Sequence, residues 1–272
     1  MKRKTQLILR LILLSASFLL LLGLAVLAIG GGWIPGSRGS AGTLEFTEEF
    51  DAVSSIDAAM EHCSIEVEPY DGDRVIASFY RRGLVRAQPP VLSAEEGRLQ
   101  ILETGGAGSW LGAARLLLQV PQDSVLSYTL RTSSGSIRLD APSCHAELHT
   151  RSGSVKVRRG GGTLEAETVS GSVKVWEPFQ SLRLQTSSGS IKAAAGGETE
   201  EVSLTSSSGS IKLCLEGTDG YELQYHTASG SVKDEYLDLS YPKSGSVTRG
   251  GGIPRIRAES RSGSIKLTDW QD

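Results

Sequence analysis

A short motif that repeats along the second half of the chain constrains the fold more than any other feature. The motif is Ser-Gly-Ser followed by Ile or Val and then, in most copies, by Lys or Arg. Its glycines are Gly135, Gly153, Gly171, Gly189, Gly209, Gly230, Gly245 and Gly263. Apart from a step of 15 residues to Gly245, successive glycines lie 18 to 21 residues apart. A period of this length is the signature of an architecture built from stacked repeats.

One repeat, residues 181–193, indicates how each copy folds. Leu182 and Leu184 alternate with polar residues, which is the pattern of a β-strand with one buried face. After Gly189 the alternation resumes in a shifted phase, with Ile191 on the buried face. The chain must therefore bend at the glycine, which accepts backbone angles that other residues avoid. Each repeat is predicted to form a strand, a glycine corner, a short strand and a loop.

Three columns of apolar residues recur at fixed distances from the glycine. Seven residues before it stand Tyr128, Ala146, Leu164, Leu182, Val202, Leu223 and Ile256. Five residues before it stand Leu130, Leu148, Ala166, Leu184, Leu204, Tyr225 and Ala258. Two residues after it stand Ile137, Val155, Val173, Ile191, Ile211, Val232 and Ile265. One repeat is too short to bury a core of its own, whereas stacked repeats share one.

These features predict an all-β chain that forms a parallel β-solenoid, or β-helix, with one coil of about 18–21 residues per repeat. Neighbouring coils should lie ~4.8 Å apart. A β-sandwich is the alternative fold, because regularly spaced short strands also suggest it. The period is too short for a propeller blade of ~40–45 residues, and no stretch has the pattern of a helical repeat.

The motif at Gly245 is predicted not to form a coil. It follows Gly230 too closely, and Pro242 stands where a central strand would need a backbone N–H. Residues 236–253 are therefore expected to form a loop between the last two coils. The predicted corner glycines are Gly135, Gly153, Gly171, Gly189, Gly209, Gly230 and Gly263.

The N-terminal segment has the features of a single membrane anchor. Residues 1–10 form a basic tail, and residues 11–29 form an uncharged run. A helix over residues 11–29 would span ~28 Å, close to the ~30 Å hydrocarbon core of a bilayer. The basic flank places residues 1–10 in the cytoplasm and the rest of the chain outside the cell. A cleaved signal peptide is the alternative, because Ala25 to Gly30 offer small residues.

The remaining chain divides into three regions. Residues 30–43 are rich in Gly and Ser and are expected to form a flexible linker. Residues 44–125 form a less regular β region, which should provide the cap and the first coils. Residues 126–272 hold the regular repeats. A cap is expected because the open end of a coil stack is an unpaired strand edge.

The repeat resembles that of a bacterial family of adhesin-like β-strand-repeat domains of unknown function. The closest copy is Thr168-Val169-Ser170-Gly171-Ser172-Val173-Lys174, beside the family's Thr-Val-Ser-Gly-Asp-Ile-Lys. Phe50, Val53, Ile56-Asp57, residues 64–68 and residues 120–123 are similar to the family's lead-in. The resemblance covers residues 44–268. It implies a membrane-anchored surface protein of a Gram-positive-type bacterium, from a family found near envelope-stress systems.

One departure from the family pattern concerns the residue after the glycine. The family has an acidic residue there, whereas this chain has Ser136, Ser154, Ser172, Ser190, Ser210, Ser231 and Ser264. The substitution argues against a ladder of carboxylates that binds cations.

A basic column is the most specific candidate site. The third residue after each corner glycine is Arg138, Lys156, Lys174, Lys192, Lys212, Lys233 or Lys266. In a parallel stack these residues form one stripe, and each neighbouring pair of like charges costs ~1 kcal/mol even in water. A polyanion such as an anionic cell-wall polymer or lipid headgroups would offset that repulsion. The alternative is a solvated strand face neutralised by nearby carboxylates such as Glu147, Glu165 and Glu167.

Two hydroxyl columns have a structural interpretation. One contains Thr132, Thr150, Thr168, Thr186 and Thr227, and the other contains Ser134, Ser152, Ser170, Ser188, Ser208 and Ser229. Stacked hydroxyls at a bend are expected to hydrogen-bond along the solenoid and satisfy the corner.

The sequence offers no pattern that is typical of an enzyme. Cys63, Cys144 and Cys214 are expected to be unpaired, because Cys144 and Cys214 lie about four coils apart. Cys144, His145 and His149 are close in sequence but lack the second ligand pair of a metal site. Phosphate-binding and nucleophile motifs are absent from the sequence. We therefore expect no catalytic residue, no metal and no cofactor.

The sequence thus predicts a non-enzymatic, adhesin-like β-solenoid on the cell surface, held by its own membrane anchor. A net charge of −3 excludes a nucleic-acid binder by charge. The expected partner is an envelope polymer, a glycan or a membrane protein. The alternative function is an accessory protein of an envelope-stress signalling system that acts through a membrane partner.

Overall fold

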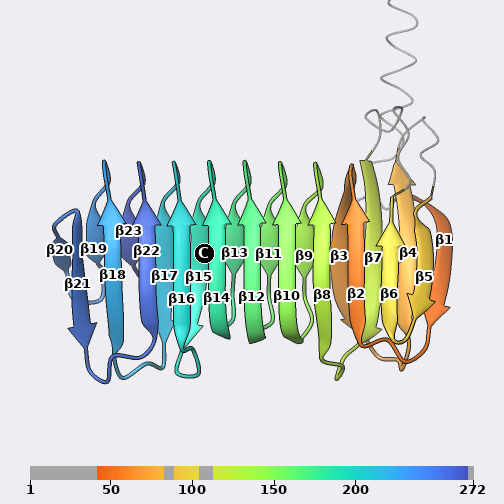
Figure 1. Ribbon diagram of the computed structural model, residues 1–272, viewed down its shortest axis with the longest axis horizontal. Helices are drawn as coiled ribbons and strands as arrows, with labels where there is room; N and C mark the ends of the chain where they lie inside the picture. Colours follow the sequence, from red (N-terminus) through yellow and green to blue (C-terminus); the bar gives the residue numbers. More distant parts are fainter. Residues whose placement is uncertain (1–41, 83–88, 104–112, 269–272) are drawn as a thin grey trace, which may run out of the picture. The chain divides into compact units, whose positions relative to one another are not determined.

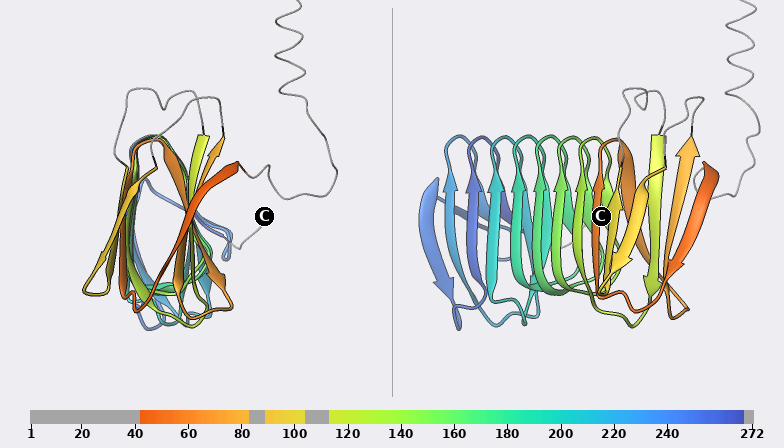
Figure 2. Two further views of the ribbon diagram at one scale, coloured as in Figure 1. Left: turned by 90° about the vertical axis from the view of Figure 1, so that its right-hand side faces the viewer. Right: turned by 45° about the vertical axis from the view of Figure 1, so that its right-hand side comes forward.

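The computed structural model describes residues 42–82, 89–103 and 113–268, and no helix occurs in these ranges. Two long sheets face each other and enclose the core between them (Figure 1, Figure 2). We call the 12-stranded sheet, which contains the short strands, sheet A, and the 11-stranded sheet sheet B. Most neighbouring strands run parallel, so the predicted all-β, solenoid-like architecture is confirmed for this part of the chain.

Each regular coil combines a longer strand of sheet B, a glycine corner and a shorter strand of sheet A. The pairs are β8 (Leu126–Thr132) and β9 (Ile137–Leu139), β10 (Ser143–Thr150) and β11 (Val155–Val157), β12 (Gly161–Thr168) and β13 (Val173–Val175), β14 (Phe179–Thr186) and β15 (Ile191–Gly196), β16 (Glu201–Ser206) and β17 (Ile211–Glu216), β18 (Tyr221–Thr227) and β19 (Val232–Asp234), and β22 (Arg255–Ser260) and β23 (Ile265–Leu267).

The core consists of the three predicted apolar columns. Residues of all three are buried along the regular coils, with Tyr128, Leu130 and Ile137 from one coil fully enclosed. Because side chains alternate across a strand, the residues between them face outward on both sheets. The fold therefore presents one outward column of sheet A at the middle residue of each three-residue strand.

The N-terminal end of the stack consists of two coils and an antiparallel cap. The strands there are β1 (Thr43–Phe50), β2 (Ser55–Met60), β3 (Cys63–Tyr70), β4 (Val75–Arg82), β5 (Val91–Glu95), β6 (Arg98–Leu102) and β7 (Ala113–Pro121). The coil of β2 and β3 pairs with β8 and β9, and β6 and β7 lie on its outer side. Strands β1, β4 and β5 close this end by antiparallel pairing.

The C-terminal end departs from sequence order. The last coil, β22 and β23, lies between the coil of β16 and β17 and the coil of β18 and β19 (Figure 1). It pairs parallel with both neighbours in each sheet. All regular repeats have the same kind of corner and the same apolar columns. The last coil can therefore pack between two earlier coils as well as at the end of the stack.

Residues 236–253, predicted to form a loop, instead include two strands. β20 (Leu239–Tyr241) pairs antiparallel with β19, and β21 (Ser244–Arg249) pairs antiparallel with β18. Gly245 lies within β21, opposite Tyr225. This segment caps the far end of the stack, because antiparallel strands end the parallel ladders there.

A buried polar cluster fixes this cap to the last coil in space. The Tyr221 hydroxyl donates to Oδ2 of the buried Asp234 at 2.8 Å, and the backbone N–H of Tyr236 donates to Oδ1 at 3.1 Å. The Tyr241 hydroxyl lies 3.4 Å from the same Oδ2 atom. Asp234 thus holds residues from β18, β20 and the connecting turn.

The predicted tail, anchor and most of the linker, residues 1–41, lie outside the described residues. Within the ranges that the structure describes, no helix has the length and apolar character needed to span a membrane.

Candidate functional site

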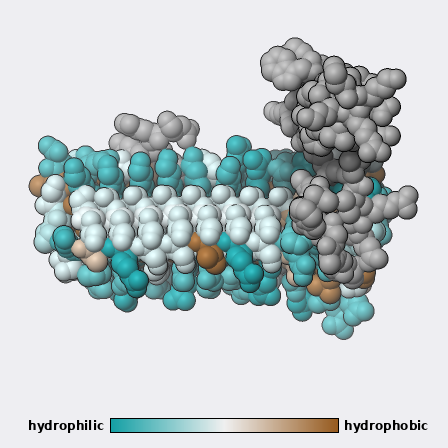
Figure 3. All heavy atoms as spheres, turned by 90° about the horizontal axis from the view of Figure 1, so that it is seen from above, coloured by the Kyte–Doolittle hydropathy of each residue, from teal (hydrophilic) through white to brown (hydrophobic). Residues whose placement is uncertain are grey.

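The glycine corners form one edge of the β unit, seen from above in Figure 3 as a continuous band of weakly polar residues. At each corner one hydroxyl joins two coils. Thr168 Oγ1 donates to the carbonyl of Gly153 at 2.9 Å and accepts from the N–H of Gly171 at 3.1 Å. The same two bonds recur at Thr132, Thr150, Thr186, Ser206, Thr227 and Ser260. The predicted structural role of the threonine column is confirmed.

The corner glycines are required for close packing and not for an unusual backbone angle. A Cβ on Gly171 would overlap the carbonyl oxygen of Gly153, and a Cβ on Gly189 would overlap that of Gly171. The same overlap with the neighbouring coil occurs at Gly135, Gly153, Gly209, Gly230 and Gly263. None of these glycines has a positive φ, so the sequence-based reason for glycine was wrong. The close approach keeps successive coils in register.

The register of sheet A brings all seven predicted cations into one row. Their order along the stack is Arg138, Lys156, Lys174, Lys192, Lys212, Lys266 and Lys233. We call this row the basic ladder. Lys266 precedes Lys233 in the row because the last coil inserts between its predecessors. Neighbouring strands are ~4.8 Å apart, so the ladder places seven like charges within ~30 Å.

Carboxylates lie at the two ends of the basic ladder. Glu66 follows Arg138 in the same row and pairs with it at 3.1 Å. At the other end Glu235 accepts from Lys266 at 2.7 Å, and this hydrogen bond lowers the pKa of Glu235. In the described part of the chain, no ion pair involves Lys156, Lys192 or Lys212. Lys156 and Lys192 therefore form no ion pair within the described ranges, whereas the charge of Lys212 also contributes to the lowered pKa of Glu235.

The carboxylates expected to neutralise the ladder lie on the opposite sheet. Glu147 belongs to β10, whereas Glu165 and Glu167 belong to β12, and both strands are in sheet B. There Glu147 pairs with Arg131 at 3.3 Å, and Glu167 lies 3.5 Å from His149. In each regular coil, residues before the glycine corner lie on sheet B, and residues after it lie on sheet A. These carboxylates therefore do not offset the repulsion within the ladder.

A second outward column runs beside the ladder, two residues further along each coil. In spatial order it contains Glu68, Asp140, Arg158, Trp176, Ala194, Cys214, Thr268 and Glu235, of which Ala194 and Cys214 are buried. Arg158 and Trp176 were not predicted as site residues, although both stand five residues after a corner glycine. Lys174 Nζ lies 4.3 Å from the centre of the Trp176 ring, and the Arg158 guanidinium lies 5.9 Å from it. The centre of the basic ladder therefore lies beside the Trp176 ring, which makes cation–π contacts with Lys174 and Arg158.

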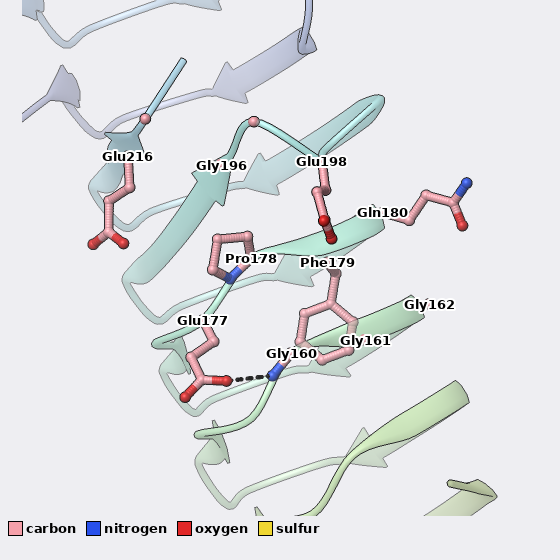
Figure 4. A pocket seen from close by; sticks show the side chains of 12 residues that line it. Gly160, Gly161, Gly162, Glu177, Pro178, Phe179, Gln180, Gly196, Glu198 and Glu216 are labelled. Atoms are coloured by element: carbon pink, nitrogen blue, oxygen red, sulfur yellow. Dashed lines mark hydrogen bonds between the residues drawn. The ribbon is translucent and has the colours of Figure 1, made fainter.

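A groove of about 930 Å³ lies at the edge opposite the glycine corners (Figure 4). Its lining includes Glu177, Glu198 and Glu216, together with glycines of several coils. Glu177 accepts from the N–H of Gly160 at 3.0 Å, and the three carboxylates do not converge on one point (Figure 4). No cluster of three or more His, Cys, Asp or Glu side chains suited to a metal occurs within the described ranges.

The three cysteines are separate thiols in different parts of the unit. Cys63 and Cys214 are buried, and Cys144 is exposed, with its Sγ 3.1 Å from Ser127 Oγ. Burial raises the pKa of the Cys63 thiol far above its ordinary value. His145 contacts Thr163 and Glu147 rather than Cys144. These groups therefore form no common site.

Comparison with known proteins identifies one family. Residues 127–268 match the model of the Toastrack DUF4097 family, so the resemblance seen in the repeat is confirmed. No curated protein matches the chain. A solved structure of a proposed cell adhesion protein from Clostridium sporogenes is 10% identical, covers 84% of this chain and all of the other, and has a TM-score of 0.40. A proposed adhesin from Bacteroides fragilis is 12% identical, covers 87% of this chain and all of the other, and has a TM-score of 0.35.

Proposed function

The chain belongs to the Toastrack DUF4097 family, and we propose that it is a non-enzymatic surface module that binds a linear polyanion along its basic ladder. The ligand class is an anionic polymer of the cell envelope. The ladder supplies the charge, and the two sheets supply a rigid support that holds the cations in a straight row.

The observation that carries this proposal is a row of cations in register in which several rungs form no ion pair among the described residues. Lys156, Lys192 and Lys212 stand in register without an ion pair among the described residues, and the nearest predicted neutralising column faces the other way. Each neighbouring pair of ammonium groups costs ~1 kcal/mol in water. A ligand with negative charges along its length removes that cost at several coils at once. An extended polymer fits this row better than a small anion, which would contact only one or two rungs.

The proposal includes the location predicted from the sequence. An uncleaved anchor at residues 11–29 would hold the β unit outside the cell, where envelope polymers are found. Protease treatment of intact cells tests this part. The β unit should be degraded while residues 1–10 stay protected, and degradation only after lysis would contradict it.

The binding test compares two variants of the full-length protein in a neutral detergent. The ladder variant carries Lys156→Gln, Lys192→Gln and Lys212→Gln. The control variant carries Arg183→Gln, Arg255→Gln and Arg257→Gln, which remove the same charge from the outer face of sheet B. Polygalacturonate and inorganic polyphosphate serve as soluble polyanions.

The wild-type protein should bind both polymers at low salt and release them at high salt, because screening weakens exposed charge pairs. The ladder variant should bind at least about tenfold more weakly, a loss of ~1.4 kcal/mol. The control variant should stay within about twofold of the wild-type affinity, since its three charges lie on the other face. Equal losses in the two variants would show that only net charge matters and would overturn the proposal.

A further inference from the structure

The C-terminal end of the stack presents the edges of two strands. There the last strand of sheet A is β20, and the last strand of sheet B is β21 (Figure 1). In the described part of the chain, no strand pairs with the outer edge of either one. An edge strand of this kind offers backbone N–H and C=O groups that can pair with another chain.

Carboxylates protect the edge strands at the other end of the stack. β1 carries Glu45, Glu48 and Glu49, and β5 carries Glu95. Charged side chains on an edge strand discourage edge-to-edge pairing, because two such edges would bring like charges together. Leu44 of β1 is half exposed, so it is charge rather than polarity that sets this end apart.

The C-terminal edge lacks this protection. β20 contains no charged residue, and β21 contains only Arg249. Gly245, Val247 and Arg249 share the core-facing side of β21, because a Cβ on Gly245 would contact the Tyr225 hydroxyl. A hydrogen bond to Tyr241 on this side raises the pKa of Arg249. The outward residues of β21 are therefore neutral.

The apolar core reaches the C-terminal end and is only partly covered there. Tyr241 of β20 and Val247 of β21 pack against the core but remain partly exposed. Leu237 and Leu239, just before and in β20, are 44% and 41% exposed. A chain that extended both sheets would remove apolar surface from water, which favours association at this end.

From these observations we infer that two copies of this chain associate through their C-terminal ends, with β21 of one copy paired antiparallel to β21 of the other. The strand suits pairing with itself, because its one charged side chain lies on the core-facing side. A two-fold axis perpendicular to the sheets relates the copies, so each sheet continues into the same sheet of the second copy. The two basic ladders then lie on one face of the dimer.

The topology is compatible with this association. The chain enters the β unit at β1, which is at the opposite end of sheet A, so the two points of entry lie at the far ends of the dimer. The inference does not depend on the proposed function, because no residue of β20 or β21 belongs to the basic ladder.

The competing interpretations are that β21 ends a monomer or that a strand of a different protein covers it. In both cases hydrogen exchange of its outward N–H groups would not depend on the concentration of this protein. In a dimer these groups are protected at high concentration and exchange on dilution, because dilution shifts the equilibrium to monomers.

The experiment follows hydrogen exchange of the full-length protein in a neutral detergent over a range of concentrations. Exchange in residues 244–249 should be at least about tenfold slower at high concentration than on dilution, whereas exchange in β1 should not change. The edge variant, Ser246→Lys with Thr248→Lys, adds two outward charges to β21 and should exchange rapidly at every concentration. The control variant, Gln180→Lys with Gln185→Lys, adds the same charge to exposed positions of β14 and should behave as the wild type.

Light scattering provides the mass of the protein in the same samples. A protein that stays monomeric at the highest concentration would overturn the inference and leave the edge to a different partner. Association without protection of β21, as expected if only residues 11–29 associate, would also overturn it, and so would equal protection in the edge and control variants. Retained melting temperatures in both variants show that the added charges do not act through unfolding.

Discussion

Lys212 and Lys266 lie side by side in register on strands β17 and β23, although the coil of β18 and β19 separates them in the sequence. The last coil inserts there because its corner bonds match both neighbours. Ser260 donates to the carbonyl of Gly209, and Thr227 donates to the carbonyl of Gly263. The row of cations continues through the inserted coil without a gap, so the insertion preserves the ladder.

Replacing a corner glycine should destabilise the stack strongly. Gly171→Ala places a methyl group on the carbonyl of Gly153, and the two coils must separate to accommodate it. The expected loss is about 2–4 kcal/mol in the free energy of unfolding. Denaturant titration measures it, with the exposed neighbour Ser170→Ala as the control at less than about 0.5 kcal/mol. Similar losses in both variants would contradict the close-packing explanation.

The corner hydroxyls should matter through their hydrogen bonds and not through their volume. Thr168→Val keeps the shape of the side chain but leaves the carbonyl of Gly153 and the N–H of Gly171 without this partner. A loss of about 2 kcal/mol is expected from these buried groups. Thr168→Ser retains both bonds and should remain close to the wild type. If Thr168→Ser lowers the free energy of unfolding as much as Thr168→Val does, then the methyl group rather than the hydroxyl stabilises the corner.

Removing the hydroxyl group from two buried tyrosines should change the free energy of unfolding in opposite directions. The Tyr128 hydroxyl is buried and has no hydrogen-bond partner among the described residues, whereas the Tyr221 hydroxyl donates to the buried Asp234. Tyr128→Phe should therefore raise the free energy of unfolding by about 1 kcal/mol, and Tyr221→Phe should lower it by about the same amount. Thermal and denaturant unfolding of the two variants, in parallel with the wild type, provide the comparison. A change of the same sign in both would disprove this assignment.

Stability should fall at alkaline pH in two stages. Burial raises the pKa of the Cys63 thiol, and it also raises the pKa values of Tyr128 and Tyr221. Each group stays protonated in the fold after it has ionised in the unfolded chain. Its stabilising contribution is therefore complete below the ordinary pKa, ~8.5 for Cys and ~10 for Tyr, and is lost as the pH rises above that value.

The denaturation midpoint should accordingly begin to fall near pH ~8.5 and fall more steeply above pH ~10. Cys63→Ala, measured against its own midpoint at neutral pH, should lack the first stage and keep the second. An unchanged first stage in this variant would show that another group causes it.

The repeat alone was sufficient to predict the coil, its buried columns and the residues of the basic ladder. Leu182, Leu184 and Ile191 alternate so regularly that the inward face of each strand follows from the sequence. The order of the terminal coils could not be predicted, because every repeat offers the same corner hydroxyl and the same columns to a neighbour. Pro242 suggested a loop, yet β20 ends just before it at Tyr241, and β21 starts at Ser244.

The electrostatic surroundings of the ladder required the structure. Glu165 and Lys174 are close in sequence, but the corner at Gly171 places them on opposite sheets. The contact between Trp176 and Arg158 depends on which coils stack, and this follows only from the register of sheet A. The two side chains themselves can be found in the sequence, because each is the fifth residue after a corner glycine.

The most direct test of the ladder as a polyanion site is to footprint its lysines in the intact protein. The described residues include seven lysines, of which six belong to the ladder and Lys243 does not. Acylation of the protein with and without polygalacturonate, followed by mass spectrometry of peptides, reports the reactivity of each lysine. The polymer should protect Lys156, Lys192 and Lys212 and leave Lys243 as reactive as before. If the polymer leaves the reactivity of every lysine unchanged, or protects Lys243 alone, the ladder is not a polyanion site.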